Sequence, residues 1–119
     1  MDFNKNKPIY LQIYDNVCER ILNGEFREGE MILSVRELAV KLGVNPNTVM
    51  RSFERLQNEG IIASQRGMGL YVCEGAKSII LKEQKKEFIE NDLPDMFKKM
   101  DLYGVTMDEL VKFKKTAVS

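Results

Sequence analysis

Near the start of the chain, apolar side chains recur at every fourth position and would share one face of a helix. The positions are Ile9, Ile13, Val17 and Ile21, with Tyr10, Tyr14 and Cys18 beside them. Pro8 suits the first turn of a helix, and Gly24 suits its end. The pattern predicts one amphipathic helix between these two residues.

A second and a third helix are predicted close together. Ser34 and Glu37 form a capping box, in which each side chain satisfies a backbone amide at a helix start. This helix has Leu38, Ala39 and Leu42 on its inward face and ends at Gly43. Only Val44 separates it from Asn45-Pro46, a favourable N-cap followed by a favourable first helical residue. The spacing predicts a tight helix-turn-helix.

The third helix is predicted to run from Pro46 to about Glu59, with Gly60 as its stop signal. Its inward positions are Val49, Ser52, Phe53 and Leu56, and its other face carries Asn47, Thr48, Met50, Arg51 and Arg55. Two strand-like runs follow, residues 61–65 and 70–73, around a glycine-bearing turn at 66–69. Three helices and a two-stranded hairpin make a winged helix.

The remaining residues are again helical in pattern. Helical spacing continues across Pro94, at Ile89, Leu93, Met96, Phe97, Met100 and Tyr103. The segment is either one kinked helix or two consecutive helices that meet near Asp92 or Leu93. Gly104 ends it, and the capping box from Thr106 to Glu109 opens a last helix. That helix has its apolar positions at Leu110, Val111 and Phe113.

Two short helices cannot bury this much apolar surface against each other, so we expect them to pair with a second copy of the chain. The predicted fold is mainly α with a small β-hairpin. It consists of a winged helix-turn-helix domain over residues 1–75 and a C-terminal helical hairpin for dimerisation over residues 76–119.

Composition limits the kinds of functional site that the chain can form. The chain has 119 residues, 44% of them hydrophobic, which is enough for one compact domain and a short appendage. It has no histidine, and Cys18 and Cys73 form no Cys-x-x-Cys pair, which excludes zinc fingers and histidine-based catalysis. We interpret both cysteines as small buried hydrophobes. No cofactor, metal site or catalytic residue is predicted, and an enzyme is not supported.

Charge points to a local basic face only. The net charge is zero, but residues 34–69 hold five basic and three acidic side chains, a local charge of +2. All the arginines precede residue 70, and arginine suits phosphate and base-edge recognition. The sequence has neither a long apolar run nor a signal peptide, so we expect a cytoplasmic protein without a membrane span.

The candidate DNA-binding residues lie on the helix-turn-helix and the wing. The second helix of such a motif enters the major groove with its N-terminal residues toward the bases. The candidates are Arg36 for a phosphate contact, Asn45, Asn47, Thr48 and Arg51 for the groove, and Arg66 and Gly67 at the wing tip. The alternatives are ordinary charged helix faces at Arg36, Arg51 and Arg55, and glycines needed only for the turn.

The sequence resembles the GntR family of bacterial transcription regulators, and within it the short YtrA-like subfamily. The resemblance rests on the segments at residues 8–13, 34–39, 42–49, 56–61 and 66–72. It implies a dimeric winged-helix repressor on a palindromic operator, with a small helical C-terminal region. The positions that match the family's DNA contacts are Arg36, Asn47, Thr48, Arg51, Arg66 and Gly67.

The chain departs from the family pattern at three positions. Longer relatives commonly carry arginine where this chain has Pro46 and Met50, so their base contacts do not transfer there. Leu33 replaces the proline expected before Ser34. The alternative function is a protein-binding winged helix, which predicts a non-polar recognition face. The methionines of the C-terminal region are interpreted as packing residues, and no polar cluster defines a small-molecule effector site.

Overall fold

The computed structural model describes residues 7–67 and 69–117. Its elements are α1 (Ile9–Leu22), α2 (Val35–Leu42), α3 (Pro46–Asn58), β1 (Ile62–Gln65), β2 (Gly69–Val72), α4 (Ala76–Glu87), the π-helical turn η1 (Phe88–Asp92), α5 (Leu93–Tyr103) and α6 (Met107–Ala117). The chain forms two compact units, residues 1–82 and 83–119. The structure confirms the predicted fold class, which is mainly helical with a small antiparallel hairpin.

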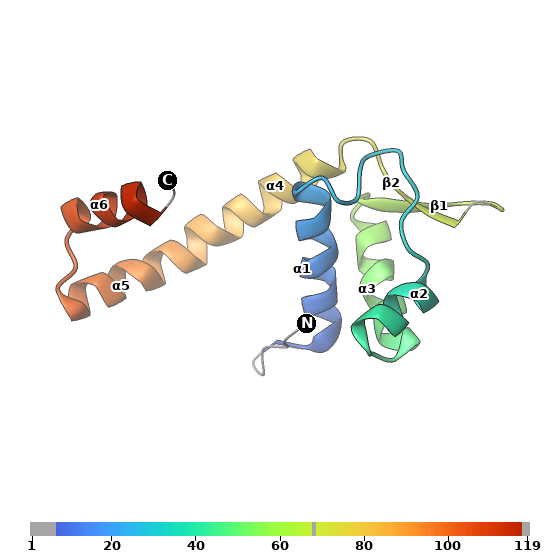
Figure 1. The fold of residues 1–119 in the computed structure, drawn as a ribbon, viewed down its shortest axis with the longest axis horizontal. Coiled ribbons are helices and arrows are strands. Elements are labelled where there is room, and N and C mark those ends of the chain that lie inside the picture. Colours follow the sequence, from blue (N-terminus) through green and yellow to red (C-terminus); the bar gives the residue numbers. More distant parts are fainter. Residues whose placement is uncertain (1–6, 68, 118–119) are drawn as a thin grey trace. The chain divides into compact units, whose positions relative to one another are not determined.

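In the first unit, α1 and α3 lie side by side and α2 crosses near the start of α3 (Figure 1). The four predicted inward positions of α3 are all buried, and they are Val49, Ser52, Phe53 and Leu56. Val49, Phe53 and Leu56 pack in one core with the predicted face of α1 from Ile13 to Ile21, whereas Ile9, which was expected on that face, is 46% exposed. The periodic pattern of the sequence therefore predicts the buried face of α3 fully and that of α1 from Ile13 onward, because burial on one face dictates the spacing.

Side-chain caps fix the turn between α2 and α3. The hydroxyl of Ser34 accepts the amide of Glu37 at 3.1 Å, and Gly43 ends α2 with a left-handed φ of 69°. The side-chain oxygen of Asn45 accepts the amide of Asn47 at 2.8 Å, with Pro46 in the first turn of α3. These contacts confirm the predicted tight helix-turn-helix.

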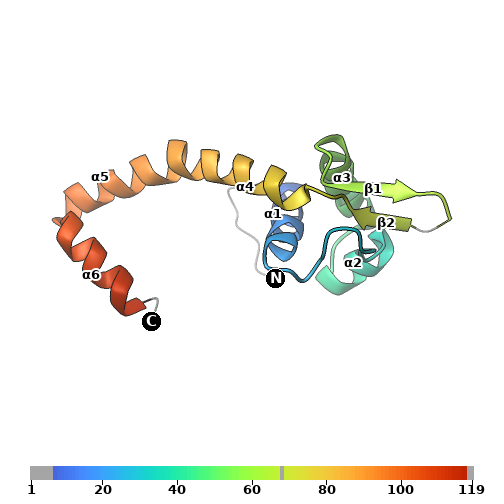
Figure 2. The ribbon, with the colours of Figure 1, turned by 90° about the horizontal axis from the view of Figure 1, so that it is seen from above.

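The wing is an antiparallel pair in which Ile62 lies opposite Val72 and Gln65 opposite Gly69. Figure 2 shows the hairpin extending beyond the helices of its own unit. Residues 29–32 line the other edge of β2, since the amide of Gly29 donates to the carbonyl of Val72 at 2.7 Å. The sequence did not predict this extra pairing. It covers an edge that would otherwise expose unpaired backbone groups.

Helix α4 begins inside the first unit. Ala76 and Ile80 are buried in its core, at 0% and 2% exposure. The carboxylate of Glu28 accepts the amides of Gly75 and Lys77, each at 3.0 Å, and these two hydrogen bonds hold the pKa of Glu28 below its usual range. The functional division after residue 75 stays a prediction, but the first core extends past it.

The second unit shows how the helical run continues past Pro94, where the sequence allows either a kink or a break. The π-helical turn η1 comes directly before α5, and Asp92 and Leu93 keep helical backbone angles, so the helical run is not broken there. Proline has no amide hydrogen and crowds the preceding turn, and a π-helical turn is one way to accommodate it. Among residues 7–67 and 69–117, no helix is both long and apolar enough to cross a membrane.

Two local predictions at the end of the chain are also confirmed. Gly104 ends α5 with a left-handed φ of 70°. Thr106 and Glu109 cap α6 reciprocally, because each side chain accepts the other's backbone amide at 3.2 Å. Among described residues 83–117, Met100 alone is buried, so this unit has almost no core of its own.

Candidate nucleic-acid interface

Helix α3 has eight exposed residues, and we call four of them, Asn47, Met50, Arg51 and Glu54, the recognition face. Thr48 is half-buried at its margin. Asn45 is exposed just before the helix, but its oxygen is occupied by the cap to Asn47. Its amide NH2 group is therefore the part of Asn45 that remains able to donate a hydrogen bond.

Arg36 occupies the first turn of α2, where Ser34 caps the helix. Its side chain is exposed, and it makes no ion pair with any described residue. The first helix of a helix-turn-helix crosses the DNA backbone, so a free cation at this position suits a phosphate.

The wing tip presents Arg66 and Gly67, both exposed, while Met68 lies outside the described residues. Gly67 has a φ of 77°, and a Cβ atom there would meet nothing within 4 Å. Backbone conformation and not space therefore requires glycine at this position. This supports a role for Gly67 in the turn and leaves Arg66 as the charged group at the tip.

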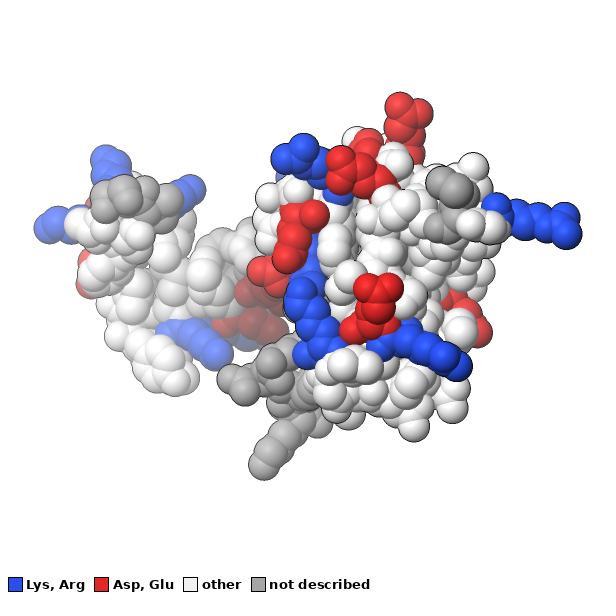
Figure 3. Space-filling view, turned by 45° about the vertical axis from the view of Figure 1, so that its right-hand side comes forward, with Lys and Arg blue, Asp and Glu red and all other residues white. Residues whose placement is uncertain are grey.

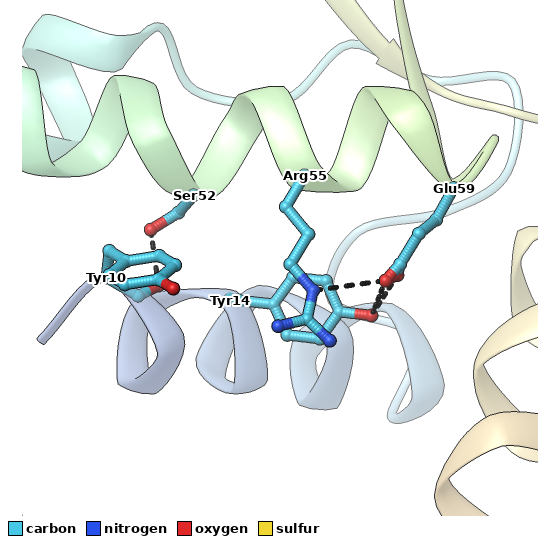
Figure 4. Close-up of polar contacts among 5 residues, drawn as sticks. All are labelled: Tyr10, Tyr14, Ser52, Arg55 and Glu59. Carbon is cyan, nitrogen blue, oxygen red and sulfur yellow. Dashed lines mark hydrogen bonds and ion pairs between the residues drawn. The ribbon is translucent and has the colours of Figure 1, made fainter. Parts of the chain in front are cut away.

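Arg51 contacts a tyrosine of α1, a helix outside the helix-turn-helix. Its guanidinium lies over the ring of Tyr10, 4.2 Å from the ring centre. The hydroxyl of Ser52 also donates to the backbone carbonyl of Tyr10 at 2.5 Å, which joins α1 to α3 at this level (Figure 4). Stacking uses the face of the guanidinium, so its N–H groups, which lie in its plane, keep access to other acceptors.

Arg55 makes the equivalent stack one turn further along α3, 4.4 Å above the ring of Tyr14. Unlike Arg51, it also binds a carboxylate, since its Nε lies 3.2 Å from Oε1 of Glu59. The Tyr14 hydroxyl donates to the same carboxylate, at 2.6 Å to Oε2 (Figure 4). Burial first, and then this hydrogen bond, raise the pKa of Tyr14. Arg55, although exposed, thus contacts two other side chains of the same unit.

Sequence reasoning missed Tyr10 and the role of Tyr14. The sequence pattern assigns both residues to an apolar helix face, which is correct for Tyr14 but incomplete. The signal was present as two tyrosines four residues apart on α1 and two arginines four residues apart on α3. Only the parallel packing of the two helices shows that the pairs meet.

Charge is mixed on the molecular surface. Figure 3 shows basic and acidic side chains interspersed on the visible face, with wide uncharged areas between them. Within the described residues, no group of three or more Cys, Asp or Glu side chains could hold a metal ion. Both cysteines are free thiols, and burial raises the pKa of Cys18 to about 12. Cys73 is only half-buried, which differs from the full burial that we expected for it.

The helix-turn-helix, the hairpin wing and the exposed recognition face define a winged helix-turn-helix DNA-binding protein. Residues 9–72 match the family model for bacterial regulatory proteins, gntR family. The chain belongs to this GntR family of transcription regulators, and it is a regulator and not an enzyme.

Similar proteins cover nearly the whole chain. An uncharacterised HTH-type transcriptional regulator from Bacillus subtilis, YhcF, is 36% identical over 96% of this chain and 93% of its own length. The HTH-type transcriptional repressor YtrA from the same organism is 36% identical over 97% of this chain and 88% of its own. A crystal structure of a GntR-family regulator from Bacteroides thetaiotaomicron has a TM-score of 0.72 and 39% identity, covering 93% of this chain and 96% of that one.

Proposed function

We propose that this protein is a repressor that binds a palindromic DNA operator as a homodimer, in the cytoplasm. The observation that carries the proposal is the capped turn between α2 and α3, together with the exposure of both the recognition face and the unpaired cation of Arg36. The name of its Bacillus relative, a transcriptional repressor, supports the direction of regulation.

Each candidate residue has a distinct role in this proposal. Arg36 contacts phosphates, and Arg66 contacts phosphate or the minor groove from the wing tip formed by Gly67. Asn47, Thr48 and Arg51 face the base edges, with Asn45 at their border through its remaining N–H donors. The protein-binding alternative is less well supported, because three of the four side chains of the recognition face are polar or charged.

The apolar surface of the second unit supports the homodimer. Large exposed hydrophobic side chains follow one another along it, namely Phe88, Ile89, Phe97, Leu102, Tyr103, Met107, Val111 and Phe113. A hollow of about 580 Å³ between α5 and α6 has Phe97, Met100 and Met107 in its lining. Burying such a surface against a second copy removes it from water, which is the main favourable term in association.

Selection from a pool of random duplexes tests the proposal directly. The full chain should enrich an inverted repeat whose half-site centres lie about one helical turn, roughly 34 Å, or a multiple of it apart. A protein-binding module would enrich no sequence over competitor DNA. A single enriched half-site without a repeat would contradict the dimeric arrangement.

A further inference from the structure

Met50 is an apolar side chain in the middle of the recognition face. It is 48% exposed, although the core beneath α3 is filled by Val49 and Phe53 on either side of it in the helix. Met50 is therefore not part of the core, and about half of its surface is open to solvent. Asn47 precedes it by three residues and Glu54 follows it by four, so the three side chains form one row along the helix.

The arginines of α3 lie to one side of this row. Arg51 and Arg55 lean toward α1, where they stack on Tyr10 and Tyr14. Successive residues of a helix point about 100° apart, as its 3.6 residues per turn require, so Met50 points away from the row that Arg51 and Arg55 form. The row of Asn47, Met50 and Glu54 makes no ion pair within the described residues, and its centre is apolar.

We propose that Met50 reads the C5-methyl group of a thymine in each half-site of the operator. The inference rests on the proposed function, because it requires α3 to enter the major groove. Thymine presents the one apolar group among the base edges there, whereas the other bases present donors and acceptors. A thioether donates no hydrogen bond and accepts only weakly, so Met50 would leave those groups unsatisfied.

The neighbour of Met50 favours the same kind of site. An asparagine binds the N6 and N7 edge of adenine with two hydrogen bonds, which suits Asn47. Three residues of helix rise span about 4.5 Å, which lies between one and two base-pair steps of roughly 3.4 Å each. The row therefore predicts that the thymine contacted by Met50 lies within one or two base pairs of an A·T pair contacted by Asn47.

Removing only the methyl group of thymine tests the proposal. In the operator selected by the full chain, each thymine is replaced in turn by deoxyuridine, and the affinity is measured. Substitution at one position of a half-site should weaken binding about fourfold, the effect of exposing one methyl group. Thymines in the spacer serve as the control, and replacing them should change nothing.

Variants of Met50 connect that loss to this residue. Met50→Leu retains an apolar side chain and should retain the loss on deoxyuridine. Met50→Gln is similar in length and a good helix former, so the fold should tolerate it at an exposed position. It should bind thymine and deoxyuridine operators equally well, and it should shift the selected base toward adenine.

The failures of the two proposals are distinguishable. If the full chain selects an operator but no deoxyuridine substitution weakens binding, the thymine contact is wrong and the DNA-binding function stands. The same holds if Met50→Gln keeps the full loss on deoxyuridine, or if the selected half-site contains no thymine. If no duplex is selected at all, both proposals are wrong.

Discussion

The guanidinium of Arg51 lies 4.2 Å above the ring of Tyr10, which joins a residue of the recognition helix to the first helix of the fold. An arginine side chain has several rotatable bonds, and fixing it costs entropy when it binds a ligand. The stack restrains the guanidinium before DNA arrives. We therefore expect Tyr10 to position Arg51 for DNA binding.

Replacing Tyr10 by leucine should weaken operator binding two- to fivefold, because an exposed cation–π contact contributes about 0.5 to 1 kcal/mol. Tyr10→Phe retains the ring face and should bind nearly as the native chain does. In the Arg51→Ala background, Tyr10→Leu should cause no further loss. Equal losses in the two backgrounds would show that Tyr10 acts independently of Arg51. Operator titration by fluorescence anisotropy supplies the affinities.

The hydroxyl of Tyr14, the tyrosine of the second stack, is expected to stabilise the fold. Tyr14 is 9% exposed, and its hydroxyl donates to the Glu59 carboxylate. Tyr14→Phe should lower the free energy of unfolding by about 1.5 kcal/mol, the lower end for a hydrogen bond to a charged group, because water can partly replace it. Urea unfolding measures the change.

Tyr103→Phe is the matched control, since Tyr103 is 72% exposed and its substitution should change stability by less than about 0.5 kcal/mol. Equal stability of the native chain and Tyr14→Phe would show that the hydroxyl contributes nothing.

The elements of the fold were predictable because their signals are local. The spacing of Val49, Phe53 and Leu56 encodes the buried face of α3, and the caps at Ser34 and Asn45 encode the helix starts. Each depends on residues within one or two turns of each other. The recognition helix and its exposed side chains follow from the same local pattern.

The contacts between distant segments were not predictable in this way. Glu28 caps a helix that begins 48 residues later, and residues 29–32 pair with β2, yet neither segment has a periodic pattern. The stack of Arg51 on Tyr10 joins residues that are far apart in the sequence, and it depends on the relative register of two helices. Such pairings are set by the assembled core, so a single sequence carries no direct signal for them.

Glu28 gives the fold a dependence on acid. Its pKa is lowered from an ordinary value of 4.5, mainly by the hydrogen bonds from Gly75 and Lys77. A carboxyl group with a lowered pKa stabilises the fold above its unfolded-state pKa, and this stabilisation is lost as the pH falls through its folded-state pKa. Glu28→Gln should therefore melt at a lower temperature than the native chain at pH 7.

The difference between Glu28→Gln and the native chain should shrink as the pH falls below about 4.5. Circular dichroism melting at several pH values measures it. Glu30→Gln is the matched control, because no hydrogen bond of the Glu30 carboxylate occurs in the described part of the chain. A gap in melting temperature that stays constant down to pH 3 would show that charge on Glu28 is not the cause.

The homodimer is expected to depend on the second unit. Sedimentation of the full chain should give twice its mass of 13.7 kDa, and a shortened chain ending at Lys82 should be monomeric. The truncation is placed after Lys82 because ending the chain at Gly75 would remove Ala76 and Ile80 from the first core. Phe113→Glu places a charge on the exposed apolar surface and should weaken the dimer. A monomeric full chain at micromolar concentration would contradict the arrangement.

The roles of Arg36 and Arg51 separate by their dependence on DNA sequence and salt. Arg36→Ala should weaken binding to operator and random DNA about equally and reduce the salt dependence by roughly one counterion per subunit, because phosphates carry no sequence information. Arg51→Ala should reduce the preference for the operator more than it reduces binding to random DNA, since a bidentate arginine contributes about 1 to 3 kcal/mol of discrimination at a base edge.

Titrations of both duplexes at several salt concentrations give the affinities of the two variants. Arg27→Ala serves as the control for loss of a positive charge. If Arg36→Ala removes the preference while Arg51→Ala lowers both affinities in parallel, then α3 lies rotated in the groove, and Asn47 and Thr48 are the main base contacts.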